Sequence, residues 1–187
     1  MTIFAALLLA ASGSAYGLGP EWQPVADPLA EARAGKLYCD TPDHAAKTCE
    51  AGAAYRFEDD GGIVSVITIP INNDPDLTVA MPMAAWIDDG ALCGRPEQAD
   101  IDRMRLLIGA KPYDTPAGRK LLALFQKELA PMMVGKTMCE HMFANGDRLF
   151  SVGIVDGEHR PELDGEIAWL DPDTMYDLRA SENVLEQ

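Results

Sequence analysis

Four cysteines constrain this chain more than any other feature of its sequence. They are Cys39, Cys49, Cys93 and Cys139, and they follow an uncharged apolar stretch at the N-terminus, Ile3 to Ala11. An even number of cysteines in an exported chain is typical of disulfides. Of the three possible connectivities, we favour Cys39–Cys49 with Cys93–Cys139. By chain entropy the shorter loop would contribute ~3 kcal/mol and the longer loop ~4 kcal/mol to stability.

The apolar N-terminal stretch has the layout of a secretory signal. Such a signal combines a basic start, an apolar stretch of about 7–15 residues and a small-residue cleavage site. Gly13 and Ala15 fit the cleavage site, so residues 1–15 are predicted to be a signal peptide and the protein to be periplasmic or secreted. The basic start is missing, because the first basic side chain is Arg33. Either the α-amino group suffices or the true start lies upstream; the alternative is a buried N-terminal helix.

A metal site or a redox-active thiol pair fits the cysteine spacing less well. Nine residues separate Cys39 from Cys49, whereas most zinc knuckles have gaps of about two to four residues. The sequence has no CxxC motif of the kind that thiol oxidoreductases use. We therefore assign the cysteines to structural disulfides.

Length and charge define the class of the chain. Residues 35–180 are predicted to form one domain, after a linker and short helix over residues 16–34 and before a frayed tail over residues 181–187. A domain of this size buries about 70% of its unfolded surface. The formal net charge is −15, which argues against binding nucleic acid or an anionic membrane through a general basic surface. The mature chain is predicted to lack an integral membrane segment.

Two regions of alternating apolar residues indicate antiparallel sheet. In the first, residues 49–94, the clearest strands are the β-branched Ile63–Ile69 and the alternating Leu77–Ile87. In the second, the dipeptides Asn145–Gly146 and Asp156–Gly157 are hairpin-turn signals. Both regions are therefore expected to be β-meanders.

The segment between the two β regions is expected to be helical. Pro96 can open a short helix, and Thr115–Pro116 supplies an N-cap and a first helical proline for a longer one. Leucine, phenylalanine and methionine then recur on one helical face until Pro131 and Gly135 end the segment. The predicted fold class is α+β: antiparallel β-meanders with about two central helices, in a single disulfide-stapled domain.

The two β regions resemble each other in sequence. Lys47–Glu50 resembles Lys136–Glu140, Ile63–Val66 resembles Leu149–Val152, and Ala85–Asp88 resembles Ala168–Asp171. The order is the same and the spacings differ by a few residues. One hypothesis is a duplication into two similar units; the alternative is that short apolar strand patterns recur by chance.

Several short motifs also resemble a known group of proteins. They are Gly35-Lys36 before Cys39, Pro42-Asp43, Lys47-Thr48-Cys49, Cys93-Gly94, Gly135-Lys136 before Cys139, and Ala168-Trp169. Across residues 35–180 the chain is similar to small secreted alphaproteobacterial proteins of uncharacterised function. The resemblance implies an exported, disulfide-containing domain and no catalytic residue.

His44 is the best candidate for acid–base chemistry in the sequence. It lies next to Asp40 and Asp43, in the loop that a Cys39–Cys49 disulfide would close. The chain has no GxSxG elbow, and Ser65 and Ser151 fall inside predicted strands, where a structural role is expected. A small hydrolase-type enzyme that uses His44 and nearby carboxylates is therefore one alternative function.

Methionines and acidic loops are the candidates for binding metals. Met81, Met83, Met138 and Met142 offer soft ligands that could suit Cu(I), but Met also fills cores readily. In a strand, Met138 and Met142 would face one side and His141 the other. The acidic stretches 72–76 and 156–166 lack the ligand order of a calcium-binding EF-hand. Copper binding by the methionines is a second alternative, and no resident cofactor is predicted.

The favoured function is that of an exported, non-catalytic protein that binds or stabilises another protein of the cell envelope. It is favoured because the sequence has no catalytic constellation, no cofactor-binding loop and only three histidines. The sequence does not identify a ligand, a specific partner or an oligomeric state.

Overall fold

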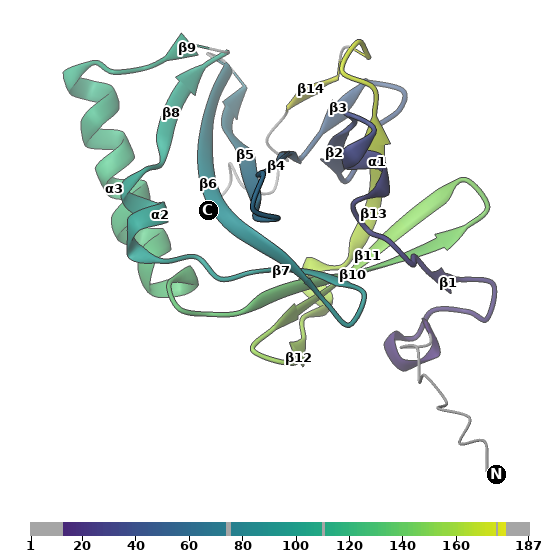
Figure 1. Ribbon diagram of the computed structural model, residues 1–187. Helices are drawn as coiled ribbons and strands as arrows, with labels where there is room; N and C mark the ends of the chain where they lie inside the picture. Colours follow the sequence, from purple (N-terminus) through teal and green to yellow (C-terminus); the bar gives the residue numbers. More distant parts are fainter. Residues whose placement is uncertain (1–12, 74–75, 110, 175, 179–187) are drawn as a thin grey trace, which may run out of the picture.

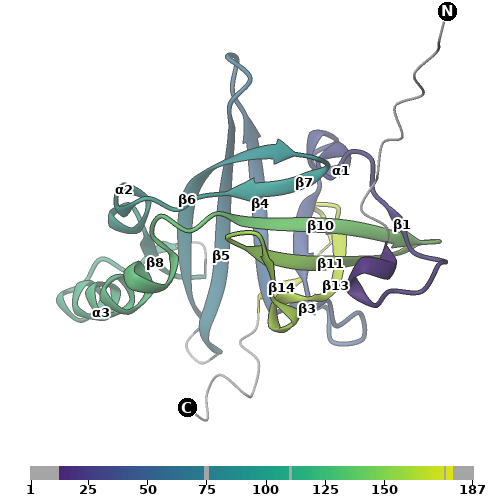
Figure 2. The same cartoon turned by 90° about the horizontal axis from the view of Figure 1, so that it is seen from below.

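The chain folds around a closed barrel of eight antiparallel strands (Figures 1 and 2). The computed structural model describes residues 13–73, 76–109, 111–174 and 176–178. Around the barrel, neighbouring strands follow the order β10, β11, β13, β2, β4, β5, β6 and β7, and β7 pairs with β10 to close the ring. Their bounds are β2 (Leu37–Asp40), β4 (Ala51–Phe57), β5 (Ile63–Asn73), β6 (Asp76–Asp88), β7 (Ala91–Gly94), β10 (Met138–Asn145), β11 (Arg148–Val155) and β13 (Gly165–Leu170).

Further short strands extend or flank the barrel. β8 (Arg105–Ile108) pairs with the first part of β6, and β9 (Lys111–Pro112) pairs with β8. β1 (Gln23–Pro24) pairs with β10, and β12 (Glu158–His159) with β11. β3 (Thr48–Cys49) and β14 (Asp177–Leu178) form a separate parallel pair.

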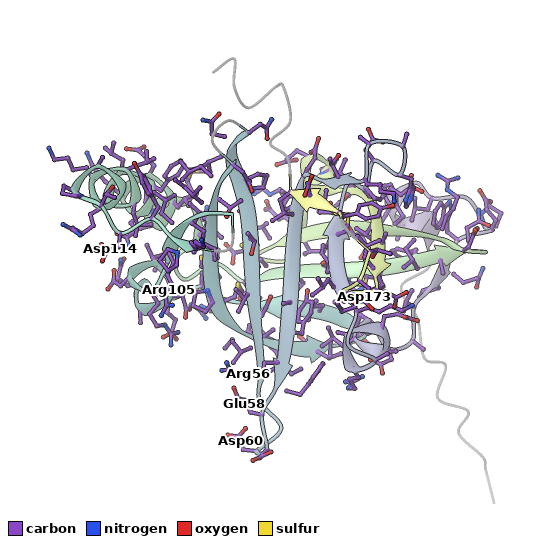
Figure 3. All side chains as sticks on the ribbon, turned by 90° about the horizontal axis from the view of Figure 1, so that it is seen from above. Arg56, Glu58, Asp60, Arg105, Asp114 and Asp173 are labelled. Carbon is purple, nitrogen blue, oxygen red and sulfur yellow. A yellow bond between two sulfur atoms is a disulfide. The ribbon has the colours of Figure 1, made fainter. Side chains whose placement is uncertain are left out.

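Tight turns connect several of the strands, and the turn at Asp156–Gly157 is one that the sequence predicts. Asp89 and Gly90, between β6 and β7, have φ angles of 46° and 78°, and Asp156 and Gly157, between β11 and β12, have 51° and 83°. Two successive positive φ angles are what the hairpin turn favoured by Asp-Gly requires. The β4–β5 hairpin is longer and projects from the barrel; Arg56 and Glu58 form a 2.7 Å ion pair near its tip (Figure 3).

The helical segment lies between β7 and β10, as expected. α2 (Gln98–Asp102) is short, and α3 (Pro116–Met133) begins where the Thr115 hydroxyl accepts a 3.0 Å hydrogen bond from the backbone N–H of Gly118. The two helices and β8 lie beside the barrel along the first part of β6 (Figure 1). An apolar core joins them: Leu77, Val79, Met81, Met83, Ile101, Met104 and Leu106 are buried there.

The expected antiparallel meanders and central helices are present, but the protein is mostly β rather than α+β. The predicted class is corrected because strands dominate the described elements and the helices are short and lie beside the barrel. Pairing of β7 with β10 and of β13 with β2 joins the meanders into one closed barrel. Both pairings connect segments far apart in the sequence, and local apolar periodicity does not specify such contacts.

The repeat hypothesis stays a prediction. Ile63–Val66 and Leu149–Val152 do lie in the middle strands of two three-stranded meanders, β4–β5–β6 and β10–β11–β13. The first matched pair of segments is not equivalent, however. Cys49 lies in β3, outside the barrel, whereas Cys139 lies in β10 within it.

The segment before the barrel, predicted as a linker and short helix, packs against it. It contains strand β1 and the short helix α1 (Ala30–Arg33), and Leu29 is fully buried; η1 (Gly13–Tyr16) overlaps the end of the predicted signal peptide. Most of the predicted signal peptide and the predicted tail from Ser181 lie outside the described residues. Within the described ranges, no helix combines the length and hydropathy needed to cross a lipid bilayer.

Two disulfides hold the fold, and both match the pairing expected from the sequence. Cys39–Cys49 connects β2 to β3, and Cys93–Cys139 connects β7 to β10. The second joins directly opposed residues, whose Cα atoms are 4.0 Å apart, at the place where the barrel closes. Disulfides at such positions fit an extracytoplasmic protein.

Candidate functional site

A cavity of about 260 Å³ lies inside the barrel. Its lining comes from every barrel strand except β13, with Met133 from the last turn of α3 and Leu163 from η2 (Pro161–Leu163). An eight-stranded barrel is just wide enough to be filled by side chains or to hold one small ligand. Here small residues leave the interior open: Ser65, Ala85, Gly94, Ser151 and Gly153 all line the cavity.

The strand register places a polar cluster in this interior. Tyr38 and Asp40 of β2 lie two positions apart, so both side chains project from the same face of their strand. On β4, Tyr55 is paired with Ser65 of β5, and on β10, Glu140 is paired with Gly153 of β11 and with Leu92 of β7. Polar groups from opposite walls of the barrel are thereby brought together.

Glu140 is the centre of the cluster. Its carboxylate accepts hydrogen bonds from the hydroxyl groups of Tyr38 and Ser151. Burial raises its pKa from 4.5 to about 7; the two hydrogen bonds oppose this rise, and the negative charge of Asp40 adds to it. Its side chain keeps some accessible surface because it faces the cavity. A carboxyl group with this pKa exchanges its proton near neutral pH.

The neighbours of Glu140 are also perturbed by burial. The pKa of Tyr38 is raised well above its usual value, chiefly by burial and next by the Glu140 carboxylate. Burial likewise raises the pKa of Tyr55 and of Asp40. Trp169 fixes both tyrosine rings, with ring centroids 5.5 Å from Tyr38 and 5.8 Å from Tyr55. Aromatic packing therefore holds the two tyrosines of the cluster in place.

The rest of the cavity wall is apolar, and no basic side chain is among its lining residues in the described part of the chain. Ile67, Met83, Leu92, Met138 and Ile154 contribute apolar surface. Glu140 and Asp40 have no ion-pair partner among the described residues. The cavity thus combines an apolar body with a patch of hydrogen-bond acceptors that carries negative charge when ionised.

η2 lies against one side of the cavity. A Cβ atom on Gly153 would come within 2.4 Å of the Leu163 Cβ, so only glycine allows η2 to pack so closely on β11. Leu163 lines the cavity yet has 47% of its surface exposed. It therefore lies between the cavity and solvent.

His44 does not form a site with the carboxylates next to it in sequence. It is exposed, and its Nδ1 lies 2.8 Å from the Tyr176 hydroxyl. Asp40 faces the barrel interior instead, and the Asp43 carboxylate accepts hydrogen bonds from the backbone N–H groups of Ala45 and Ala46. The expected arrangement of histidine and carboxylates is not brought together.

His44 does line a second hollow of about 540 Å³, at β13. Two pairs of its charged lining groups are ion-paired, Lys36 with Glu31 at 2.6 Å and Arg148 with Glu166 at 3.2 Å, and Asp147 also lines it. Exposed ion pairs of this kind are typical of a solvated surface. The smaller interior cavity, whose two carboxyl groups are perturbed by burial, is the better candidate site.

The four methionines considered as soft ligands lie in different places. Met81 is buried in the core beneath α3, and Met142 in a separate core with Leu29 and Ile167. Met83 and Met138 line the cavity, together with Met133, which the sequence did not single out. His141 stacks on Tyr16, with ring centroids 5.9 Å apart, and is not among the cavity-lining residues. Among the described residues, no group of three or more His, Cys, Asp or Glu side chains could hold a metal ion.

The acidic loop after β11 serves the fold. Asp156 accepts a hydrogen bond from the backbone N–H of Thr137 at 2.9 Å. Asp164 accepts one from the backbone N–H of Gly153 at 3.0 Å and lies 2.8 Å from His159. These contacts fix the loop beside the cavity. The other acidic stretch, 72–76, lies partly outside the described residues.

Comparison of the chain with protein-family models, with curated proteins and with solved structures found no match in any of the three. The cavity and its side chains therefore carry the functional argument alone.

Sequence reasoning missed Tyr38, Tyr55 and Glu140. The available signal was a polar residue between apolar ones on a single strand face, as in Met138, Glu140 and Met142, but the same pattern also arises on a solvent-facing strand.

Proposed function

We propose that the protein is an exported, non-catalytic binding protein that encloses a small ligand inside its barrel. The observation that carries the proposal is the cavity of about 260 Å³. A typical barrel of this size fills its interior with side chains, and an apolar cavity of about 150 Å³ is enough to bind benzene. The present cavity has room for a ring with a short side chain.

The lining supports binding of a small molecule. Ligand sites are concave and mostly apolar, with a few polar groups that orient the ligand. The cavity has this composition, since the cluster around Glu140 lies within an otherwise apolar wall. Binding of another envelope protein, the partner expected from the sequence, remains a separate proposal for the outer surface.

Two neighbouring alanines of β6 allow a matched test of the proposal. Ala85 lines the cavity, whereas Ala84 is exposed. A library of small fragments is screened by amide chemical shifts on the wild-type protein, with 2-phenylethanol as a neutral reference. Bound fragments should shift amides of β2, β4 and β10 in the wild type and in Ala84→Leu, and Ala85→Leu should abolish the shifts by filling the cavity. The proposal is wrong if no fragment shifts these amides, or if Ala85→Leu binds as the wild type does.

A further inference from the structure

If the barrel binds a small ligand, as proposed above, the charge of the cavity lining indicates which chemical class of ligand it favours. Two carboxyl groups line the cavity, those of Glu140 and Asp40. Among the described residues, no Lys, Arg or His lines it. Buried charges in proteins are normally paired. The hydroxyls of Tyr38 and Ser151 donate hydrogen bonds to Glu140, but a hydroxyl does not neutralise its charge. A cationic ligand would supply what the protein itself lacks.

We propose that the barrel binds a small protonated amine, with its ammonium group at Glu140 and Asp40 and its apolar body among Ile67, Met83 and Leu92. An ammonium group has three N–H donors, and the two carboxylates offer acceptors for them. The rings of Tyr38 and Tyr55 also line the polar end, and aromatic faces attract cations. An anionic ligand is disfavoured because both carboxylates would repel it.

The size of the cavity limits the apolar part of the amine. Since about 150 Å³ accommodates benzene, a cavity of about 260 Å³ fits a phenyl ring with a two-carbon side chain and an amino group. 2-Phenylethylamine has these dimensions and serves as the probe. 2-Phenylethanol has nearly the same shape without the charge, and phenylacetate carries the opposite charge.

The amine should bind with a characteristic pH dependence. The titratable groups that face Glu140 are Tyr38 and Asp40 of β2 and Tyr55 of β4. The amine stays protonated between pH 6 and pH 8, as lysine does. Because the pKa of Glu140 is about 7, its carboxyl group is ionised in most protein molecules at pH 8 and in few at pH 6. Affinity for the amine should therefore fall about tenfold from pH 8 to pH 6, and affinity for the alcohol should not.

The test titrates all three probes by calorimetry into the wild type, Glu140→Gln and Glu128→Gln. Glu128 is exposed on α3 and provides a matched control. At pH 8 the wild type and Glu128→Gln should bind the amine about tenfold or more tightly than the alcohol, and phenylacetate least. Glu140→Gln should abolish this preference and keep its affinity for the alcohol. Asp40→Asn tests the same point if Glu140→Gln does not fold.

The outcomes separate this inference from the proposed function. Equal affinity of the wild type for amine and alcohol, or an unchanged preference in Glu140→Gln, overturns the inference and leaves cavity binding intact. Absence of amine binding at pH 8 overturns it too. The proposed function fails if the whole fragment library leaves the cavity amides unshifted, or if Ala85→Leu binds the fragments as the wild type does.

Discussion

In the ligand-free protein, replacing Glu140 by glutamine should raise the free energy of unfolding at alkaline pH and have little effect on it near pH 4. In the folded protein burial raises the pKa of Glu140 from 4.5 to about 7. Below pH 4.5 this side chain is protonated in both the folded and the unfolded chain, so it costs no stability. Between pH 4.5 and pH 7 the unfolded chain releases the proton first, and the wild type loses stability as the pH rises. Above pH 7 both states are ionised and the loss is complete.

The size of this effect follows from the two pKa values. At about 1.4 kcal/mol for each factor of ten in the ionisation constant, a rise from 4.5 to about 7 corresponds to about 3 kcal/mol at pH 8. Glutamine resembles the protonated acid in shape and can still accept the hydrogen bond from Tyr38. Its amide N–H groups must find acceptors, so we expect a net stabilisation of about 2–3 kcal/mol.

Denaturant unfolding of the oxidised protein measures the prediction directly. Fluorescence of the three tryptophans reports unfolding of the wild type, Glu140→Gln and Glu128→Gln at intervals from pH 4 to pH 8.5, and linear extrapolation gives the free energy of unfolding. In thermal unfolding the gain corresponds to about 2–4 °C in Tm for each kcal/mol. The reasoning is refuted if the difference between Glu140→Gln and wild type does not change with pH, or if the variant is the less stable protein at pH 8.

Three further predictions concern stability. Gly153→Ala should cost about 1–3 kcal/mol, because its Cβ would lie 2.4 Å from that of Leu163; Gly165→Ala, whose nearest contact would be 3.6 Å away, should be tolerated in the same unfolding assay. Replacing both Cys93 and Cys139 by alanine should lower the free energy of unfolding by about 4 kcal/mol, more than the ~3 kcal/mol expected for replacing Cys39 and Cys49. A larger loss from replacing Cys39 and Cys49 would contradict this order. Thr115→Ala should cost about 1 kcal/mol by removing the cap of α3, and Thr115→Ser should restore most of it.

Local features of the fold could be predicted from the sequence because each depends on a few adjacent residues. The Asp-Gly turn after β11 and the start of α3 at Thr115 are encoded by turn and capping chemistry within four residues. The strand around Ile63–Ile69 follows from β-branched side chains. The disulfide pairing could be predicted because Cys39 and Cys49 are only 10 positions apart, so that a local turn can bring them together.

The closed barrel and the cavity could not be predicted in this way. Tyr38 and Glu140 are hydrogen-bonded across a separation of 102 positions, and no local pattern links them. On a strand, an inward-facing polar residue alternates with its neighbours just as an outward-facing one does. The sequence therefore does not distinguish Glu140 from a solvent-facing residue, and it predicts only a structural role for Ser65 and Ser151; strand pairing places all three on the inner wall.

The disulfide between β7 and β10 bears on how a ligand of the proposed kind would enter and leave the barrel. β7 has only four residues and joins the two halves of the barrel. Without the covalent bond between Cys93 and Cys139, this short strand would be the natural place for the wall to part during slow fluctuations. Because the bond keeps β7 joined to β10, the side of the cavity at η2, where the half-exposed Leu163 lines it, is the passage that a ligand of the proposed kind would use. Under the proposed function, the residence time of a ligand would then depend on the movement of Leu163 and its short helix.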